Sequence, residues 1–348
     1  MKIVIAPDSY KECLSAIQVA ETLAGTVTDM YPGAEVVQLP LSDGGEGLLD
    51  ILSKALKAQV VQTDVHDPLG RPVKARLGLI NRTAIIEVAE ACGLQRLSTR
   101  ERNPLQASSR GVGELILAAY QMGGRSFFLG LGGTATCDGG KGMLSVAGIK
   151  DVLKSISIEL LCDVDAPFVG PRGAARVFAP QKGATPEEVE VLEKRMTELA
   201  RSIGKETGVH IADQPGAGAA GGLGGALMAY SSARFRNGVG RVMDLTGYDE
   251  AIKGAHLIIT GEGKSDAQTL MGKVPMGVLQ RAKGLPVALL SGRIENRSQL
   301  EQAGFRPVIE VSPRDLPLSE ALKPESAMEN LRQAILSPFF TQYVAGEA

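Results

Sequence analysis

The chain has 348 residues, of which 44% are hydrophobic and 22% are charged, and this length exceeds what one hydrophobic core usually supports, so we expect two domains. The net charge of −2 and the absence of long lysine or arginine runs argue against nucleic acid or a membrane as the partner. A small-molecule substrate is therefore expected.

Short β-branched runs alternate with helical patterns towards both ends of the chain. Runs at 3–6 and 35–39 predict strands, and each leads through a polar turn into a helix, at 15–29 and 48–58. Three more runs of buried type lie at 256–260, 286–290 and 307–311. This alternation predicts five parallel strands in a doubly wound α/β sheet.

The middle of the chain has a different pattern. Apolar and polar residues alternate around 60–65 and 73–77, and the turn at 67–72 between them predicts an antiparallel pair. Further strands are expected at 83–88 and 158–161, with helices at 113–122 and 185–203. We therefore expect a second, mixed α/β domain at 61–244, inserted into an outer domain made of 1–60 and 245–348, with the chemistry in the cleft between them.

The segment 130–142 holds six glycines, two threonines, one aspartate and one lysine, directly after an apolar run at 127–129. Glycines let backbone amides approach an anion closely and permit the positive φ angles that turn successive amides inward. The segment that follows is predicted to be a helix, whose N-terminus favours the same negative charge. The other interpretation is a strand-to-helix turn that needs only flexibility.

Three carboxylates, Asp8, Asp43 and Glu262, follow predicted strands of the outer domain, and Ser9 and Ser42 add hydroxyls beside two of them. In a doubly wound sheet, ligands bind beyond the carboxyl ends of the strands. Clustered carboxylates at this edge indicate a Mg²⁺ site or a general base. Taken singly, each aspartate also fits a helix N-cap.

Other site classes lack support in the sequence. The G-x-G-x-x-G at 216–221 follows no convincing strand, and G-K-S at 263–265 lacks the earlier glycine of a nucleotide-binding P-loop. The cysteines and histidines are scattered, which argues against zinc and disulfides; they are Cys13, Cys92, Cys137, Cys162, His66, His210 and His256. Amide turns, lysines and carboxylates remain, and this set suits phosphoryl transfer.

Nine motifs, in order from residue 6 to about 280, carry a specific resemblance: APDSYKECLSA, LSDGGEG, DPLGRPV, NPLQASSRGVGELI, GLGGTATCDGG, CDVDAPFVGPRGA, FAPQKGATP, PGAGAAGGLG and ITGEGKSDAQTLMGK. Together they resemble the bacterial glycerate kinase type 1 family. The resemblance implies a flavodoxin-like domain and a second α/β domain, and a kinase that uses ATP and Mg²⁺ to convert D-glycerate to 2-phosphoglycerate. Cys137 stands where the family often has asparagine, and the segment 149–159 is shorter than usual.

The resemblance and the turns together give a hypothesis for the site. The catalytic residues are Asp8, Lys11 and Asp43, and Mg²⁺ is held by Asp43 or Asp266. Lys264 or Lys273 neutralises phosphate charge, and the substrate-binding residues are Ser9, Ser42, Arg71 and Lys273. ATP phosphates lie against the glycine loop, so the cofactor-binding residues are Gly130, Gly132, Gly133, Thr134, Thr136, Asp138, Gly139, Gly140, Glu262 and Lys264.

Arg71 is the candidate to clamp the glycerate carboxylate, because a guanidinium fork matches a carboxylate in two places. A solvated turn charge is the other interpretation. Three alternatives for the whole protein also stay open: phosphorylation at the 3-hydroxyl, a regulator that binds nucleotide or phosphosugar without turnover, and a dinucleotide-dependent dehydrogenase. We expect a cytoplasmic monomer or homodimer.

Overall fold

The computed structural model describes residues 1–345, which fall into two compact units. The first unit comprises Met1–Asp43 and the chain from Val239 onward, and the second comprises Gly44–Gly238. The first boundary therefore precedes the helix α2 (Leu48–Leu56), whereas the sequence led us to expect it after this helix. The reason is packing, because α2 contacts strands β4 (Pro72–Ile80) and β5 (Thr83–Glu87) of the second unit.

The first unit is built on a five-stranded sheet in the order β11-β10-β9-β1-β2, and every neighbouring pair is parallel. The strands are β1 (Lys2–Ile5), β2 (Glu35–Gln38), β9 (Leu257–Ser265), β10 (Val287–Ile294) and β11 (Val308–Glu310). Numbered within the unit, this is the flavodoxin-like order 2-1-3-4-5. The predicted parallel sheet is confirmed.

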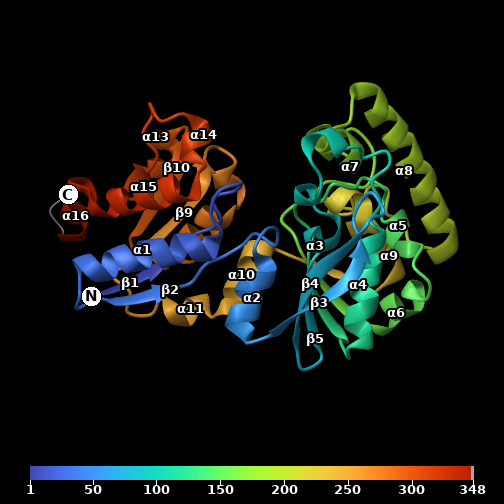
Figure 1. Cartoon of the computed structure of the whole chain (residues 1–348), viewed down its shortest axis with the longest axis horizontal. Coiled ribbons are helices and arrows are strands. Elements are labelled where there is room, and N and C mark those ends of the chain that lie inside the picture. The colour runs from blue at the N-terminus through green and yellow to red at the C-terminus, as the bar shows by residue number, and fades with distance from the viewer. Residues whose placement is uncertain (346–348) are drawn as a thin grey trace. The chain divides into compact units, whose positions relative to one another are not determined.

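Both faces of this sheet are buried, as continuous apolar strands predict. Ile3 and Ile5 pack with α1 (Ala16–Met30) and α15 (Pro324–Leu336), which lie side by side in Figure 1. The alternate residue Val4 is also fully buried, and α12 (Val274–Arg281) packs against β9 and β10. The remaining helices of the unit are α10 (Gly238–Thr246), α11 (Tyr248–Ala251), α13 (Arg297–Ala303), α14 (Leu318–Ala321) and α16 (Pro338–Ala345).

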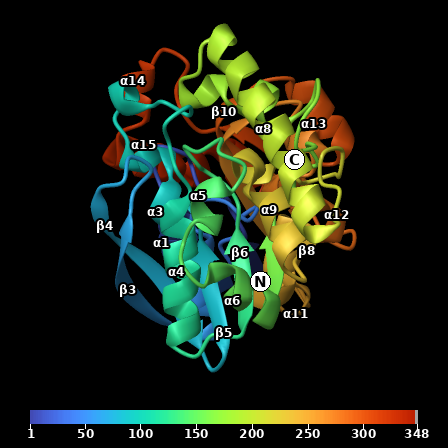
Figure 2. The ribbon, with the colours of Figure 1, turned by 90° about the vertical axis from the view of Figure 1, so that its right-hand side faces the viewer.

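The second unit holds a six-stranded sheet in the order β3-β4-β5-β6-β7-β8. Strands β3 to β5 are antiparallel and β5 to β8 are parallel, which confirms the mixed sheet. Its further strands are β3 (Gln59–His66), β6 (Ser126–Gly130), β7 (Ser157–Leu161) and β8 (Arg234–Arg236). Helix α4 (Arg110–Gln121) packs across β3, β4 and β5, as Figure 2 shows.

The longest helix of the second unit, α8 (Pro186–Thr207), begins with a capping box between Thr185 and Glu188, which explains why it starts where the sequence predicts. The other helices of this unit are α3 (Ala89–Cys92), α5 (Lys141–Leu144), α6 (Ile149–Ser155), α7 (Ala174–Phe178) and α9 (Leu223–Tyr230). Between residues 1 and 345, no helix combines the length and apolar character needed to cross a bilayer.

Candidate active site

The carboxyl edge of the first unit's sheet carries the three predicted acids. Asp8 follows β1, Asp43 follows β2, and Glu262 lies within β9, which continues to Ser265 because its pairing with β10 does. In the sheet, β2 lies on one side of β1 and β9 lies on the other side. The strand order therefore reverses between β1 and β9. Ligands bind at such reversals.

A cavity of about 280 Å³ opens at this edge. Its wall brings together seven residues of the hypothesis, which come from segments far apart in the sequence: Asp8, Ser9, Lys11, Asp43, Glu262, Lys264 and Lys273. Asp266 and Ser42 lie outside this wall. The sequence therefore predicted most of the polar lining of one cavity.

Asp8 is a buried acid of the cavity wall, with 6% of its surface exposed. The backbone amide of Ser9 donates to its Oδ1 at 2.7 Å. Burial, followed by the negative charge of Asp43, raises the pKa of Asp8 well above its usual value, and the Ser9 amide and Lys11 oppose this shift. A carboxylate with a raised pKa is suited to accept a proton near neutral pH.

Glu262 is equally buried, but its carboxylate is tied to the protein. The hydroxyls of Ser265 and Thr269 donate to its Oε1 at 3.0 and 2.5 Å, and Lys273 Nζ lies 3.7 Å from its Oε2. Burial raises the pKa of Glu262, and the Thr269 hydroxyl and Lys273 oppose this effect. The geometry makes Glu262 an anchor for Lys273 at the cavity wall.

Ser9 presents a buried hydroxyl at the cavity. The residue is 3% exposed, yet its Oγ has no hydrogen-bond partner among the described residues. Buried hydroxyls in native proteins nearly always have partners, so an unpaired one that lines a cavity points to a ligand group. This supports the prediction that Ser9 contacts substrate.

The glycine loop of the second unit holds an anion of its own. The carboxylate of Asp138 accepts hydrogen bonds from the amides of Ser109, Gly140 and Gly142 and from the Ser109 hydroxyl, at 2.9–3.1 Å. The helix that follows, α5, has only four residues, so its dipole is small. The second half of the loop is therefore closed on Asp138.

The first half of the loop is open. The amides of Gly132, Gly133 and Thr134 donate no hydrogen bond within residues 1–345. Gly133 is exposed and has a φ of 69°, a left-handed conformation that favours glycine. An amide that donates no hydrogen bond within the protein can donate one to a phosphate oxygen.

Lys182, which lies in the motif FAPQKGATP, contacts this loop through a buried side chain. It is 3% exposed, and its Nζ donates to Thr134 Oγ1 at 3.1 Å and to the Thr136 carbonyl at 2.8 Å. Burial lowers the pKa of Lys182. The motif did not indicate that this lysine is buried, because its burial results from tertiary packing.

Arg71 lies on the predicted turn, and its guanidinium is occupied there. Its Nε donates to Asp67 at 2.5 Å, one terminal nitrogen donates to Glu101 at 2.6 Å, and the other donates to the Arg96 carbonyl at 3.3 Å. Asp67 also accepts from the amides of Leu69 and Arg71, which closes the turn. Binding glycerate here would require these ion pairs to open.

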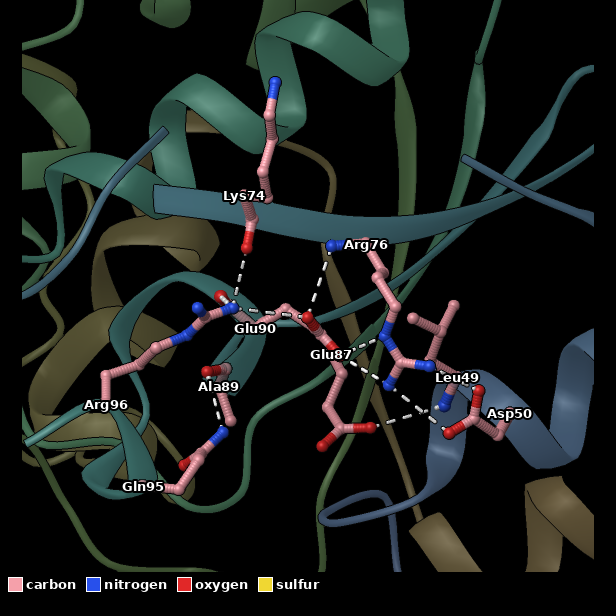
Figure 3. A network of polar contacts seen from close by, with 9 residues as sticks. All are labelled: Leu49, Asp50, Lys74, Arg76, Glu87, Ala89, Glu90, Gln95 and Arg96. Carbon is pink, nitrogen blue, oxygen red and sulfur yellow. Dashed lines mark hydrogen bonds and ion pairs between the residues drawn. The ribbon is translucent and has the colours of Figure 1, made fainter. Parts of the chain in front are cut away.

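Glu87, which sequence reasoning missed, ends β5 beside Gly130 of the glycine loop and is 7% exposed. Arg76 does not pair with Glu87, because it binds the neighbouring acids Glu90 and Asp50, as Figure 3 shows. The hydrogen bond to the Glu87 carboxylate comes from the Leu49 amide, at 3.4 Å. Burial raises the pKa of Glu87 to about 7. Its charge state therefore changes near neutral pH.

We predict that Glu87→Gln makes the protein more stable than the parent at pH 8 but not at pH 5. The pKa of Glu87 rises from 4.5 to about 7 on folding, so its stabilising contribution is complete below 4.5 and is lost as the pH rises through 7. In urea unfolding, the difference between the two proteins should change by about 2–3 kcal/mol across this range. A difference that is independent of pH would contradict the shift.

The site can now be compared with known proteins. A sequence profile of the glycerate kinase family matches residues 3–152 and 145–337. The chain is 38% identical to the glycerate kinase of Bacillus subtilis (strain 168), with 93% of each chain covered. It is 37% identical to the glycerate 2-kinase of Escherichia coli (strain K12), with 96% of each covered. A crystal structure of a candidate glycerate kinase 2 from Salmonella typhimurium LT2 matches with a TM-score of 0.83 and 37% identity, over 100% of both chains. The chain therefore belongs to the glycerate kinase family.

Proposed function

We propose that this protein is an ATP-dependent kinase that phosphorylates D-glycerate at its 2-hydroxyl. Family membership supports the reaction class, and the relative from Escherichia coli, a glycerate 2-kinase, supports the position. The observation that carries the proposal is the cavity at the sheet edge, where buried carboxylates and lysines meet. Phosphoryl transfer requires this combination of positioned charges.

Asp8 is the proposed general base, because its carboxylate is held by the Ser9 amide and has a raised pKa. The 2-hydroxyl oxygen of glycerate bonds to the γ-phosphorus as the bond between that phosphorus and the ADP oxygen breaks. The hydroxyl proton moves to the Asp8 carboxylate. Lys11, on the same cavity wall, balances the charge of the acceptor.

The donor set fits Mg²⁺, which typically binds one or two protein carboxylates and completes its shell with water and phosphate oxygens. Across residues 1–345, no group of three or more histidine, cysteine or acidic side chains is arranged as a metal cage. Asp43 would supply a cavity ligand, whereas the Asp266 carboxylate accepts from the Gln268 amide at 2.8 Å outside the cavity wall. Bound Mg²⁺ would neutralise phosphate charge.

We also propose roles for the other residues that would bind the nucleotide and the acceptor. Lys264 and Lys273 would neutralise nucleotide phosphates, and Ser9 would orient the acceptor, whereas Ser42 is fully buried outside the cavity wall. In the second unit, the open amides of the glycine loop would bind a phosphate oxygen. The carboxylate clamp by Arg71, the cytoplasmic location and the state of monomer or homodimer stay predictions.

We predict that the product formed from ATP and D-glycerate is converted directly to phosphoenolpyruvate by added enolase. Enolase removes water from 2-phosphoglycerate, so the coupled assay reports the position of the new phosphate. Phosphoenolpyruvate that forms only after a phosphoglycerate mutase is added would show transfer to the 3-hydroxyl. Nucleotide binding with no ADP release in the presence of D-glycerate would indicate a regulator.

A further inference from the structure

The residues that line the cavity of the first unit divide by chemistry into two sets, which we call its polar half and its apolar half. The polar half holds the carboxylates and lysines described above, whereas six side chains of the other half are apolar or weakly polar: Cys13, Val311, Leu318, Ala321, Leu322 and Ala327. They come from the loop after β1, from the residue after β11 and from α14 and α15 with the turn between them. One continuous cavity thus joins an ionic site to an apolar one.

D-glycerate makes no use of the apolar half. It is a three-carbon acid with two hydroxyls, and each end of the molecule is polar or charged. Binding is favoured when an apolar group displaces water from the apolar surface of a cavity, because this lowers the free energy. Val311 and Ala327 also pack in the core of the unit, and a substrate with an apolar part of its own would make use of the side of this lining that faces the cavity.

The apolar lining combines small buried residues with one large exposed residue. Ala321 and Ala327 are small and buried, at 8% and 5% exposed, while the neighbouring Leu318 is 65% exposed on the short helix α14. Ligand sites typically combine such apolar walls with a few polar groups that fix orientation.

We infer that the apolar half binds the purine ring of ATP, with the phosphates directed to Lys264 and Lys273 in the polar half of the same cavity. This inference rests on the proposed function, because it identifies the nucleotide as the second substrate of that site. It assigns α14 a role in nucleotide binding that none of the sequence motifs indicated.

A tryptophan reporter tests the inference directly, because the natural sequence contains no tryptophan. Leu318→Trp places the only indole of the protein at the apolar half. Its fluorescence should change on addition of ADP or adenosine and stay constant with D-glycerate or inorganic phosphate. Leu336→Trp, 48% exposed at the end of α15 and outside the cavity wall, is the matched control and should respond to none of them. A Leu318→Trp signal that follows D-glycerate only, or no ligand, would overturn the inference.

A second variant tests catalysis. Ala321→Leu places a larger side chain in the apolar half and should raise the KM for ATP on the order of tenfold, with the KM for D-glycerate nearly unchanged. Ala303→Leu makes the same change at an exposed position of α13 and should leave both constants unaltered. A rise confined to the KM for D-glycerate, or no change in a folded Ala321→Leu protein, would contradict the inference. If this variant does not fold, the fluorescence titration still decides. That titration needs no turnover, so nucleotide binding without transfer to D-glycerate would refute only the proposed function.

Discussion

Asp43→Asn is expected to lower turnover on the order of 10²-fold or more, because it removes a proposed Mg²⁺ ligand from the cavity while keeping the shape of the side chain. Asp43 also acts on its neighbour, since its charge is the second-largest cause of the raised pKa of Asp8. Removing that charge lowers the pKa of Asp8. The acid limb of the pH–rate profile should therefore move to lower pH in the variant.

The measurement is steady-state kinetics across pH, with Mg²⁺ titrated at each point. Asp29→Asn, an exposed aspartate on α1 of the same unit, is the matched control and should behave like the parent. A folded Asp43→Asn protein with near-normal turnover would place Asp43 among structural loop residues. Lost turnover with an unshifted acid limb would keep Asp43 as a ligand but remove Asp8 as the base.

The sequence predicted the first unit well because local signals and tertiary packing agree there. The runs at β1, β9 and β10 are apolar on both faces, and Ser15 caps α1 together with Gln18, so these elements could be located before their partners were known. Polar residues that follow parallel strands share one edge. This rule alone brought Asp8 and Asp43 to a single cavity.

The second unit shows what sequence reasoning missed. The glycines of the loop at 130–142 suggested an open anion cradle, but Asp138 binds two of its amides, and a Cβ at Gly130 or Gly132 would collide with the backbone at Gly44 or Gly45. The burial of Lys182 and Glu87 was not indicated by the sequence. These features depend on contacts between distant segments, and one sequence carries no local mark of them.

Gly133→Val is expected to weaken ATP binding on the order of tenfold or more, with a smaller effect on D-glycerate. The φ of 69° at Gly133 turns its amide into the open half of the loop, and a β-branched residue disfavours this conformation. Space alone is no obstacle, because a Cβ at Gly133 would lie 3.5 Å from the Ala89 side chain. The expected defect is therefore the loss of aligned amides rather than a clash. Calorimetry with a non-hydrolysable ATP analogue, and separately with D-glycerate, measures both affinities.

Gly208→Val is the control variant for the effect of backbone strain alone. Gly208 follows α8 in the same unit with a φ of 76°, and a Cβ there would meet no atom within 4 Å. The two variants should lose similar stability, so their melting temperatures should fall together, while only Gly133→Val should lose nucleotide affinity. Equal affinity in both proteins would mean that the loop is a packing turn. A selective loss of D-glycerate binding in Gly133→Val would instead assign the three open amides to the acceptor, since a carboxylate and a phosphate oxygen accept hydrogen bonds from backbone amides in the same way.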